Sequence, residues 1–138
     1  MSGIKTSARN LFKGTVKKVI TGAVNSEVVL DIGGQEIAAI ITNESAKNLG
    51  LKEGGQAYAM IKASWVILTD GAPGLKVSAR NDLRGTVEKI TKGAVNSEVS
   101  VKIAGDRAIV AVITNASVDS LGLKEGGPAG AMIKASHV

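Results

Sequence analysis

The chain has 138 residues, a formal net charge of +5 and no cysteine. The lack of cysteine excludes disulfides, thiolate nucleophiles and cysteine-ligated metals. No apolar run approaches the roughly 20 residues that cross a bilayer, and residues 1–5 lack the apolar stretch of a signal peptide. We therefore expect a cytoplasmic protein with no membrane partner, whose excess of basic residues suits anionic ligands in general.

The second half of the chain repeats the first. Residues 7–66 reappear as residues 78–138 after a one-residue insertion, and a repeat of this length predicts two folded domains. We place the first domain at 1–69, a linker at 70–76 and the second domain at 77–138. A domain of about 60 residues buries little surface, so we expect the two to dock with each other and with other chains.

The first half of each repeat has the pattern of antiparallel strands. Residues 11–20 alternate apolar and lysine side chains around Gly14, which predicts a strand with a bend or a close backbone approach at the glycine. Residues 22–26 have the residue types of a turn. Residues 27–32 then alternate again, and Gly33-Gly34 predicts a hairpin.

The second half of each repeat adds a strand, a short helix and a last strand. Residues 37–42 are rich in β-branched side chains. Thr42 or Asn43 can cap a short helix, and Gly50 stands where a left-handed residue ends it. Residues 57–68 read as one last strand. We predict an all-β fold with short helices, in which two tandem five-stranded barrels resemble the oligonucleotide/oligosaccharide-binding (OB) type.

Blocks that are identical in the two copies collect hydrogen-bond donors, and their charged members are cations. In the first copy they are Ser7-Ala8-Arg9-Asn10, Thr42, and Lys62-Ala63-Ser64. Arginine, lysine, hydroxyl groups and accessible backbone N–H groups suit a small tetrahedral oxyanion. Each block taken alone is more typical of a solvated turn or an exposed strand.

Catalytic patterns are weak in this sequence. The single histidine, His137, replaces Trp65 of the first copy, so no histidine-based triad is repeated. Glu27 and Glu98 occupy matched turns without a repeated carboxylate partner, and there is no acidic cluster or histidine pair for a metal cation. We expect a binding protein that is no enzyme and holds no metal cation and no organic cofactor.

Five further features of the two copies point to a family. The runs Ser-Ala-Arg-Asn-x-x-x-Gly-x-Val, Gly-Ala-Val-Asn-Ser-Glu-Val, Ile-Thr-Asn-x-Ser, Leu-Gly-Leu-Lys-Glu-Gly and Ile-Lys-Ala-Ser occur twice in the same order. They resemble the molybdopterin-binding-protein-like (Mop) domain, and the doubled arrangement resembles the two-domain molbindins of bacteria. The resemblance implies two Mop barrels that bind molybdate or tungstate for intracellular molybdenum storage and homeostasis. It also implies a homotrimer with oxyanions at domain and subunit interfaces.

The same resemblance implies two classes of oxyanion site. The first class would use Ser7, Ala8, Arg9, Thr42, Lys62 and Ser64, with Ser78, Ala79, Arg80, Thr114, Lys134 and Ser136 of the second copy. The second class would use the Gly-Ala-Val-Asn turns, at Ala23, Val24 and Asn25 and at Ala94, Val95 and Asn96.

Two other functions remain open from the sequence. An OB-like barrel with a positive net charge could bind single-stranded nucleic acid, but such surfaces use rows of stacking aromatic rings, and this chain has one Phe, one Tyr and one Trp. We therefore expect no nucleic-acid partner. A scaffold whose basic groups are merely solvated is the third alternative.

Overall fold

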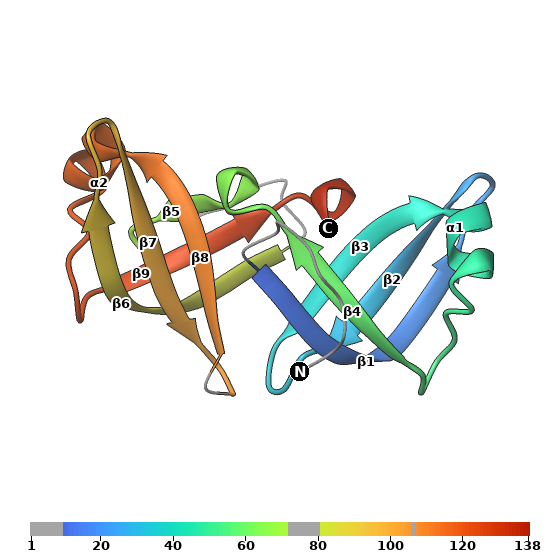
Figure 1. Ribbon diagram of the computed structural model, residues 1–138. Coiled ribbons are helices and arrows are strands. Elements are labelled where there is room, and N and C mark those ends of the chain that lie inside the picture. Colours follow the sequence, from blue (N-terminus) through green and yellow to red (C-terminus); the bar gives the residue numbers. More distant parts are fainter. Residues whose placement is uncertain (1–9, 72–80, 106) are drawn as a thin grey trace.

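The computed structural model describes residues 10–71, 81–105 and 107–138, which form two curled antiparallel sheets (Figure 1). The first sheet has the order β3-β2-β1-β4 and the second has the order β5-β9-β6-β7-β8. No helix in these ranges is long and apolar enough to cross a membrane. The strands are β1 (Asn10–Thr21), β2 (Asn25–Asp31), β3 (Glu36–Thr42), β4 (Gln56–Ile61), β5 (Ile67–Thr69), β6 (Asn81–Lys92), β7 (Asn96–Ile103), β8 (Arg107–Thr114) and β9 (Pro128–Ile133).

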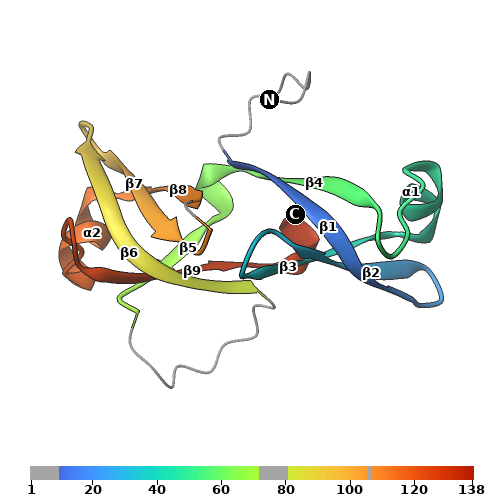
Figure 2. The same ribbon diagram turned by 90° about the horizontal axis from the view of Figure 1, so that it is seen from below.

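The long first strand of each copy serves two neighbours. β1 pairs with β4 through its first half and with β2 through its second half, and Figure 2 shows β1 and β4 side by side. The predicted close approach at Gly14 is confirmed, because a Cβ there would lie 2.7 Å from the carbonyl oxygen of Asp31. The register shifts between Val16 and Lys18, where a bulge bends the strand.

The predicted short helix is confirmed in both copies. The helices are α1 (Asn43–Asn48) and α2 (Asn115–Leu121). The hydroxyl oxygen of Thr42 accepts a hydrogen bond of 3.1 Å from the backbone N–H of Ser45, which caps α1. Gly50 follows the helix with φ +65°, in the left-handed region expected for a residue that ends a helix.

The prediction of one uninterrupted last strand over 57–68 is wrong. A 3-10 turn, η1 (Ala63–Trp65), separates β4 from β5, and the backbone N–H of Trp65 donates to the carbonyl oxygen of Lys62 at 3.0 Å. This turn redirects the chain to the other sheet, where β5 pairs with β9 in the register Leu68 to Ala131. The last strand of the first copy therefore completes the sheet of the second.

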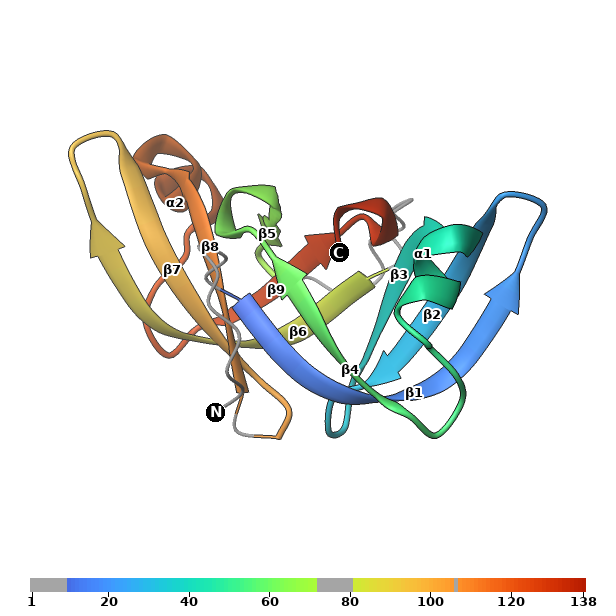
Figure 3. The same cartoon turned by 45° about the vertical axis from the view of Figure 1, so that its right-hand side comes forward.

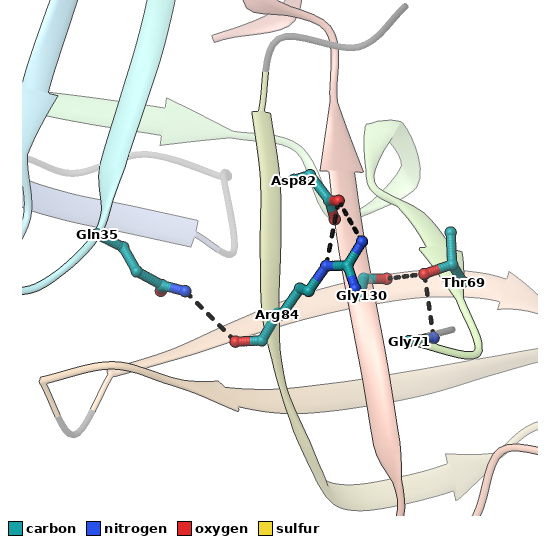
Figure 4. A network of polar contacts seen from close by, with 6 residues as sticks. All are labelled: Gln35, Thr69, Gly71, Asp82, Arg84 and Gly130. Carbon is teal, nitrogen blue, oxygen red and sulfur yellow. Dashed lines mark hydrogen bonds and ion pairs between the residues drawn. The ribbon is translucent and has the colours of Figure 1, made fainter. Parts of the chain in front are cut away.

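Polar contacts hold β5 and the residues around it in place (Figure 4). The Thr69 hydroxyl donates to the carbonyl oxygen of Gly130 at 3.5 Å and accepts from the backbone N–H of Gly71 at 3.3 Å. Nearby, the Gln35 side chain of the first copy donates to the backbone carbonyl oxygen of Arg84 in the second at 3.3 Å. The two copies are thus joined by both main-chain and side-chain contacts.

One apolar core serves both copies. A single cluster of buried side chains includes Ile32, Ile37 and Ile61 from the first copy together with Ile109 and Ile133 from the second. These five side chains are at most 1% exposed. Two small domains therefore share their burial, as their size requires.

Candidate functional site

The repeated Lys-Ala-Ser blocks form two tight turns with a buried centre. In η1, Ala63 is 5% exposed, whereas the side chains on either side of it, Lys62 and Ser64, are exposed. The second turn, η2 (Ala135–His137), repeats this pattern with Ala135 buried between exposed Lys134 and Ser136. Each turn therefore anchors on an alanine and presents one ammonium and one hydroxyl group to solvent.

Each turn packs on a strand of the other copy. η1 lies against β8 and η2 lies against β3, as Figure 1 shows. Ala135 forms a small buried cluster with Ala38 on β3 and Val29 on β2. Small side chains at this contact let the backbone of the turn approach the strand closely. The donors of each turn consequently lie at the boundary between the two copies.

A buried asparagine fixes the approach of the first turn to β8. Asn10 is 2% exposed, and its side-chain amide donates to the carbonyl oxygen of Val110 at 2.8 Å while accepting from the backbone N–H of Val110 at 2.7 Å. The same amide donates to the carbonyl oxygen of Ile61 at 3.2 Å. Because Ile61 immediately precedes Lys62, Asn10 ties the start of the first Lys-Ala-Ser turn to the second copy.

The second copy makes the reciprocal contact. Asn81 is 2% exposed, and its amide donates to the carbonyl oxygen of Ala38 at 2.8 Å and accepts from the backbone N–H of Ala38 at 2.7 Å. The side chain thus pairs with the edge of β3 as another strand would. The sequence grouped these asparagines with the donors suited to an oxyanion, but the structure uses their amides to join the two copies, because their partners lie in the other copy.

The two turns meet through the rings at their ends. The ring centroids of Trp65 and His137 are 4.8 Å apart, with an interplanar angle of 37°. The Lys62 ammonium lies 5.2 Å from the centroid of the Trp65 ring, within the range of a cation–π contact. Lys62, Ser64, Lys134 and Ser136 are therefore brought to one region of the molecule.

The two threonines of the first predicted class lie elsewhere. Thr42 ends β3 and caps α1, and its hydroxyl also donates to the Ser45 hydroxyl at 2.9 Å. Thr114 caps α2 in the same way, accepting from the backbone N–H of Ser117 at 3.1 Å. Thr42 lies four positions after Ala38, which is about 13 Å along a strand. Within one chain, the structure does not bring these threonines to the Lys-Ala-Ser turns.

Thr42 instead adjoins the Gly-Ala-Val-Asn turn of the second predicted class. The backbone N–H of Asn43 donates to the carbonyl oxygen of Val24 at 2.8 Å, and the Asn43 amide donates to that of Gly22 at 2.9 Å. The buried Ser26 hydroxyl donates to the Asn43 side-chain oxygen at 2.5 Å. Asn43 therefore fixes the turn. The sequence did not predict this role; it showed only that the Ile-Thr-Asn block is the same in both copies.

The second copy fixes its turn with the same contacts. Asn115 donates through its backbone N–H to the carbonyl oxygen of Val95 at 2.8 Å and through its amide to that of Gly93 at 3.1 Å. Val24 and Val95 are each 69% exposed at the tips. Ala23 and Asn25, with Ala94 and Asn96, are exposed beside them. The candidate residues of the second class thus form two rigid, solvent-facing turns.

The remaining predicted ligands fall outside the described residues. They are Ser7, Ala8, Arg9, Ser78, Ala79 and Arg80. Among the residues that the structure describes, no group of three or more His, Asp or Glu side chains could hold a metal ion.

We expect Thr42→Ala to lower the free energy of unfolding by about 1 kcal/mol, because the first N–H groups of α1 lose their cap. Thr42→Ser, which keeps the hydroxyl oxygen, should cost no more than a few tenths of that. Urea unfolding followed by circular dichroism measures both changes. Equal losses in the two variants would show that the methyl group, and not the cap, stabilises this corner.

Comparison with known proteins identifies each half with one family. The model of the TOBE domain matches residues 6–68 and again residues 77–138. The molybdenum-pterin-binding protein MopA of Rhodobacter capsulatus is 45% identical over 136 residues, which are 98% of this chain and 51% of MopA. The molybdenum transport protein ModE of Herbaspirillum seropedicae is 41% identical over 98% of this chain and 51% of ModE. The chain spans about half the length of these curated relatives.

A solved structure of similar length has the same fold. The cytoplasmic molybdate-binding protein ModG, in a crystal form with molybdate bound, superimposes with a TM-score of 0.93 at 47% sequence identity. The match covers 97% of this chain and 96% of ModG. The predicted fold class, an all-β chain of two tandem domains with short helices, is thereby confirmed. The predicted five strands occur in the second sheet, whereas the first has four because β5 joins the other sheet.

Proposed function

The chain belongs to the TOBE domain family and contains that domain twice, and we propose that it binds molybdate or tungstate. The observation that carries the proposal is the pair of Lys-Ala-Ser turns, which present ammonium and hydroxyl donors where the two copies meet. The likeness of the whole chain to ModG, a molybdate-binding protein, supports the choice of oxyanion.

The donor chemistry fits a tetrahedral dianion. Lysine supplies a compact positive charge, and a serine hydroxyl donates one short hydrogen bond, so each turn can meet two oxygens of one anion. Arg9 and Arg80 belong to the same proposed set, and their planar guanidinium groups could each donate two parallel bonds. Rigid donors favour an anion large enough to meet all of them at once, which would discriminate against sulfate.

Further copies of the chain would complete the first class of site. Thr42 and Thr114 belong to the proposed ligand set, yet each lies at the far end of a strand from the docked turn of the other copy. A second chain that places its threonine against a Lys-Ala-Ser turn would supply the missing donor. We propose a homotrimer, as the resemblance to two-domain molbindins implies, with oxyanions at both domain and subunit interfaces.

The Gly-Ala-Val-Asn turns would form the second class of site. Their tips are exposed, while their bases are fixed by Asn43 and Asn115. Symmetry-related tips that meet around an axis could hold an anion through backbone N–H groups. This class would use Ala23, Val24 and Asn25 with Ala94, Val95 and Asn96.

A binding role without catalysis follows from this chemistry. Oxyanion capture by fixed donors makes and breaks no covalent bond, so the protein would store molybdenum and hold its free concentration steady. We place it in the cytoplasm, as ModG is described. Organic cofactors, nucleic acids and membranes have no part in this proposal.

We expect Lys62→Ala and Lys134→Ala each to weaken the binding of molybdate at its own sites by about 10- to 100-fold. A hydrogen bond to a charged group contributes about 1.5–3 kcal/mol, and each 1.4 kcal/mol is tenfold in affinity. Equilibrium dialysis against molybdate at fixed ionic strength measures both the dissociation constant and the number of sites filled. The double variant should lose high-affinity binding at the first class of site altogether.

Lys47→Ala is the matched control. Lys47 is an exposed lysine in the last turn of α1, so its removal changes the net charge equally while leaving the turns intact. We expect it to alter affinity less than twofold. If Lys47→Ala weakened binding as much as Lys62→Ala, general electrostatic attraction would replace the specific site.

A further inference from the structure

A polar hollow lies where the β2–β3 hairpin of the first copy meets the β7–β8 hairpin of the second. Figure 3 shows the ends of these hairpins side by side, and the backbone N–H of Ala104 donates to the Gln35 side-chain oxygen there at 3.3 Å. The volume of the hollow is about 380 Å³. Its lining includes Lys13, Thr15, Asp31, Gly33 and Gln56 of the first copy and Arg107 of the second. All of these residues lie outside the two proposed classes of molybdate site.

Strand register puts four polar side chains of the hollow on one face of the first sheet. Thr15 of β1 lies directly opposite Asp31 of β2 on one side and Gln56 of β4 on the other. Side chains of directly opposed residues share a face, with Cβ atoms about 4.5–5.5 Å apart. Lys13 precedes Thr15 by two residues on the same strand, so it points to that face as well. The sheet thus gathers an ammonium, a hydroxyl, an amide and a carboxylate group on one surface.

Arg107 brings a second cation to this surface from the other copy. Its Nη2 donates to the backbone carbonyl oxygen of Lys13 at 3.1 Å. Its Nε lies beside the hairpin turn, 3.8 Å from the position that a Cβ on Gly33 would take. Among the described residues, Arg107 makes no other side-chain hydrogen bond. Most of the five N–H donors of its guanidinium group are therefore available to a ligand.

Asp31 decides which kind of anion suits the hollow. Its Oδ1 accepts a hydrogen bond of 2.9 Å from the backbone N–H of Gly33, which orients the carboxylate. An ionised carboxylate can only accept hydrogen bonds, and it repels a fully ionised anion beside it. Molybdate and sulfate carry no proton at neutral pH, whereas hydrogen phosphate carries one. An anion with an O–H group can therefore accept from both cations and donate to Asp31.

The internal repeat provides a comparison site with different charges. Lys13 corresponds to Arg84, whose backbone carbonyl oxygen accepts from the Gln35 amide at 3.3 Å (Figure 4). A neutral amide therefore stands where the hollow has the Arg107 guanidinium. The Arg84 guanidinium is itself bonded to Asp82, at 3.2 Å.

The carboxylate also differs between the two places. Lys102 stands at the position that matches Asp31, and Pro128 stands at the position that matches Gln56. Among the described residues, two cations facing one carboxylate thus occur at one of the two junctions between the copies. Because the other junction forms the same hairpin contact without this combination, joining the copies does not require it.

We propose that this hollow binds a protonated phosphate group, either as inorganic phosphate or as the end of a small phosphate monoester. Lys13 and Arg107 donate to its ionised oxygens, and the Asp31 carboxylate accepts its O–H. Thr15 and Gln56 lie on either side of the same row and complete the polar lining. This site is separate from the molybdate sites and does not depend on them.

The test follows the NMR chemical shifts of the Thr15 and Gly33 amides in the full chain, at constant ionic strength near neutral pH. Phosphate, glycerol phosphate and sulfate are added in separate titrations. We expect at least one of the two phosphate compounds to give shifts that saturate below about 10 mM, as two charge-assisted bonds allow. Sulfate should bind at least about tenfold more weakly, because it has no proton for Asp31.

Two variants separate the cation from general charge. Arg107→Gln copies the comparison site and should weaken phosphate binding at least about tenfold. Lys47→Gln removes the same charge from an exposed position on α1 and should change phosphate binding less than about twofold.

Asp31→Asn tests the choice of anion. The amide keeps an oxygen for the Gly33 N–H but replaces the ionised oxygen with a donor. We expect sulfate to bind this variant within about threefold of phosphate, because the repulsion is gone. The affinity for molybdate should be unchanged in this variant and in Arg107→Gln.

Three results would overturn the proposal. They are the absence of saturable shifts with both phosphate compounds, sulfate binding as tight as phosphate binding in the unmodified chain, and equal losses in Arg107→Gln and Lys47→Gln. The first two are measured on the unmodified chain, so a variant that fails to fold does not protect the proposal. A failure to bind molybdate would leave these titrations unaffected.

Discussion

Replacing Asn81 by alanine should lower the free energy of unfolding by about 2–5 kcal/mol. The change removes both partners of Ala38, a 5% exposed residue whose N–H and carbonyl groups bond to the Asn81 amide at 2.7 and 2.8 Å. A buried polar group left unpaired costs about 1–3 kcal/mol, and here there are two. Asn10→Ala should cost at least as much, because the Asn10 amide also bonds to Ile61. Urea unfolding followed by circular dichroism measures both changes.

Asn48→Ala is the control for this pair, since Asn48 is an exposed residue at the end of α1 and should change stability by no more than about 0.5 kcal/mol. The Asn81 variant should also change the fluorescence of Trp65, the one tryptophan, because loosening β3 from the second copy disturbs the contact between Trp65 and His137. A stability loss under 1 kcal/mol for both asparagine variants would mean that water replaces the amides.

Among glycine-to-alanine substitutions in the second copy, Gly85→Ala should lower the free energy of unfolding the most. A Cβ added at residue 85 would lie 1.9 Å from the backbone carbonyl oxygen of Lys102. Gly85 and Lys102 lie in the paired strands β6 and β7, so the clash is between main chains. Neither can move without separating β6 from β7. We expect a loss of at least about 3 kcal/mol, at the upper end of what overpacking costs, measured by thermal unfolding of purified protein.

Gly126→Ala is the comparison that isolates this clash. Gly126 has φ +85° and nothing within 4 Å of an added Cβ, so only backbone strain of about 1 kcal/mol should appear. Gly14→Ala, with the same contact at 2.7 Å in the first copy, should fall between the two. Equal losses at the open and the crowded glycine would show that β6 and β7 adjust freely.

Local features of this fold could be predicted from the sequence because their causes are local. The close approach at Gly14 follows from a glycine inside an alternating strand. The cap at Thr42 and the left-handed Gly50 follow from the residue types that helix ends require. Each of these signals is read within a few residues of the feature that it predicts.

The connections between the copies could not be predicted in this way. Residues 57–68 have the composition of a strand, and only the docking of Ala63 against the other copy explains why the chain turns there. The roles of Asn10 and Asn81 depend on the edges of β8 and β3, which are remote in the chain. Identity between the copies marked these blocks, but it did not say what they contact.

The candidate site shows the same division. The sequence selected the Lys-Ala-Ser blocks as donors, and the structure brings both of them to the boundary between the copies. The structure places Thr42 away from these blocks, although the sequence grouped it with them. Thr42 lies at the end of β3, several residues from the position where the turn docks, and the sequence of a short motif does not show this distance.

The aromatic residues bear on the nucleic-acid alternative. Phe12 is 3% exposed in the core, and the Trp65 ring contacts His137. Tyr58 lines an apolar groove beside β4. These three rings do not form the row of exposed platforms on which successive bases stack.

The most direct test of oxyanion binding is a calorimetric titration of the full chain with molybdate in phosphate-free buffer, repeated in a large excess of sulfate. We predict tight binding that sulfate does not suppress, because the proposed set of donors at the boundary between the copies would favour an anion large enough to meet all of them at once. A folded protein that gives no heat with molybdate, or whose binding sulfate abolishes, would contradict the proposed function.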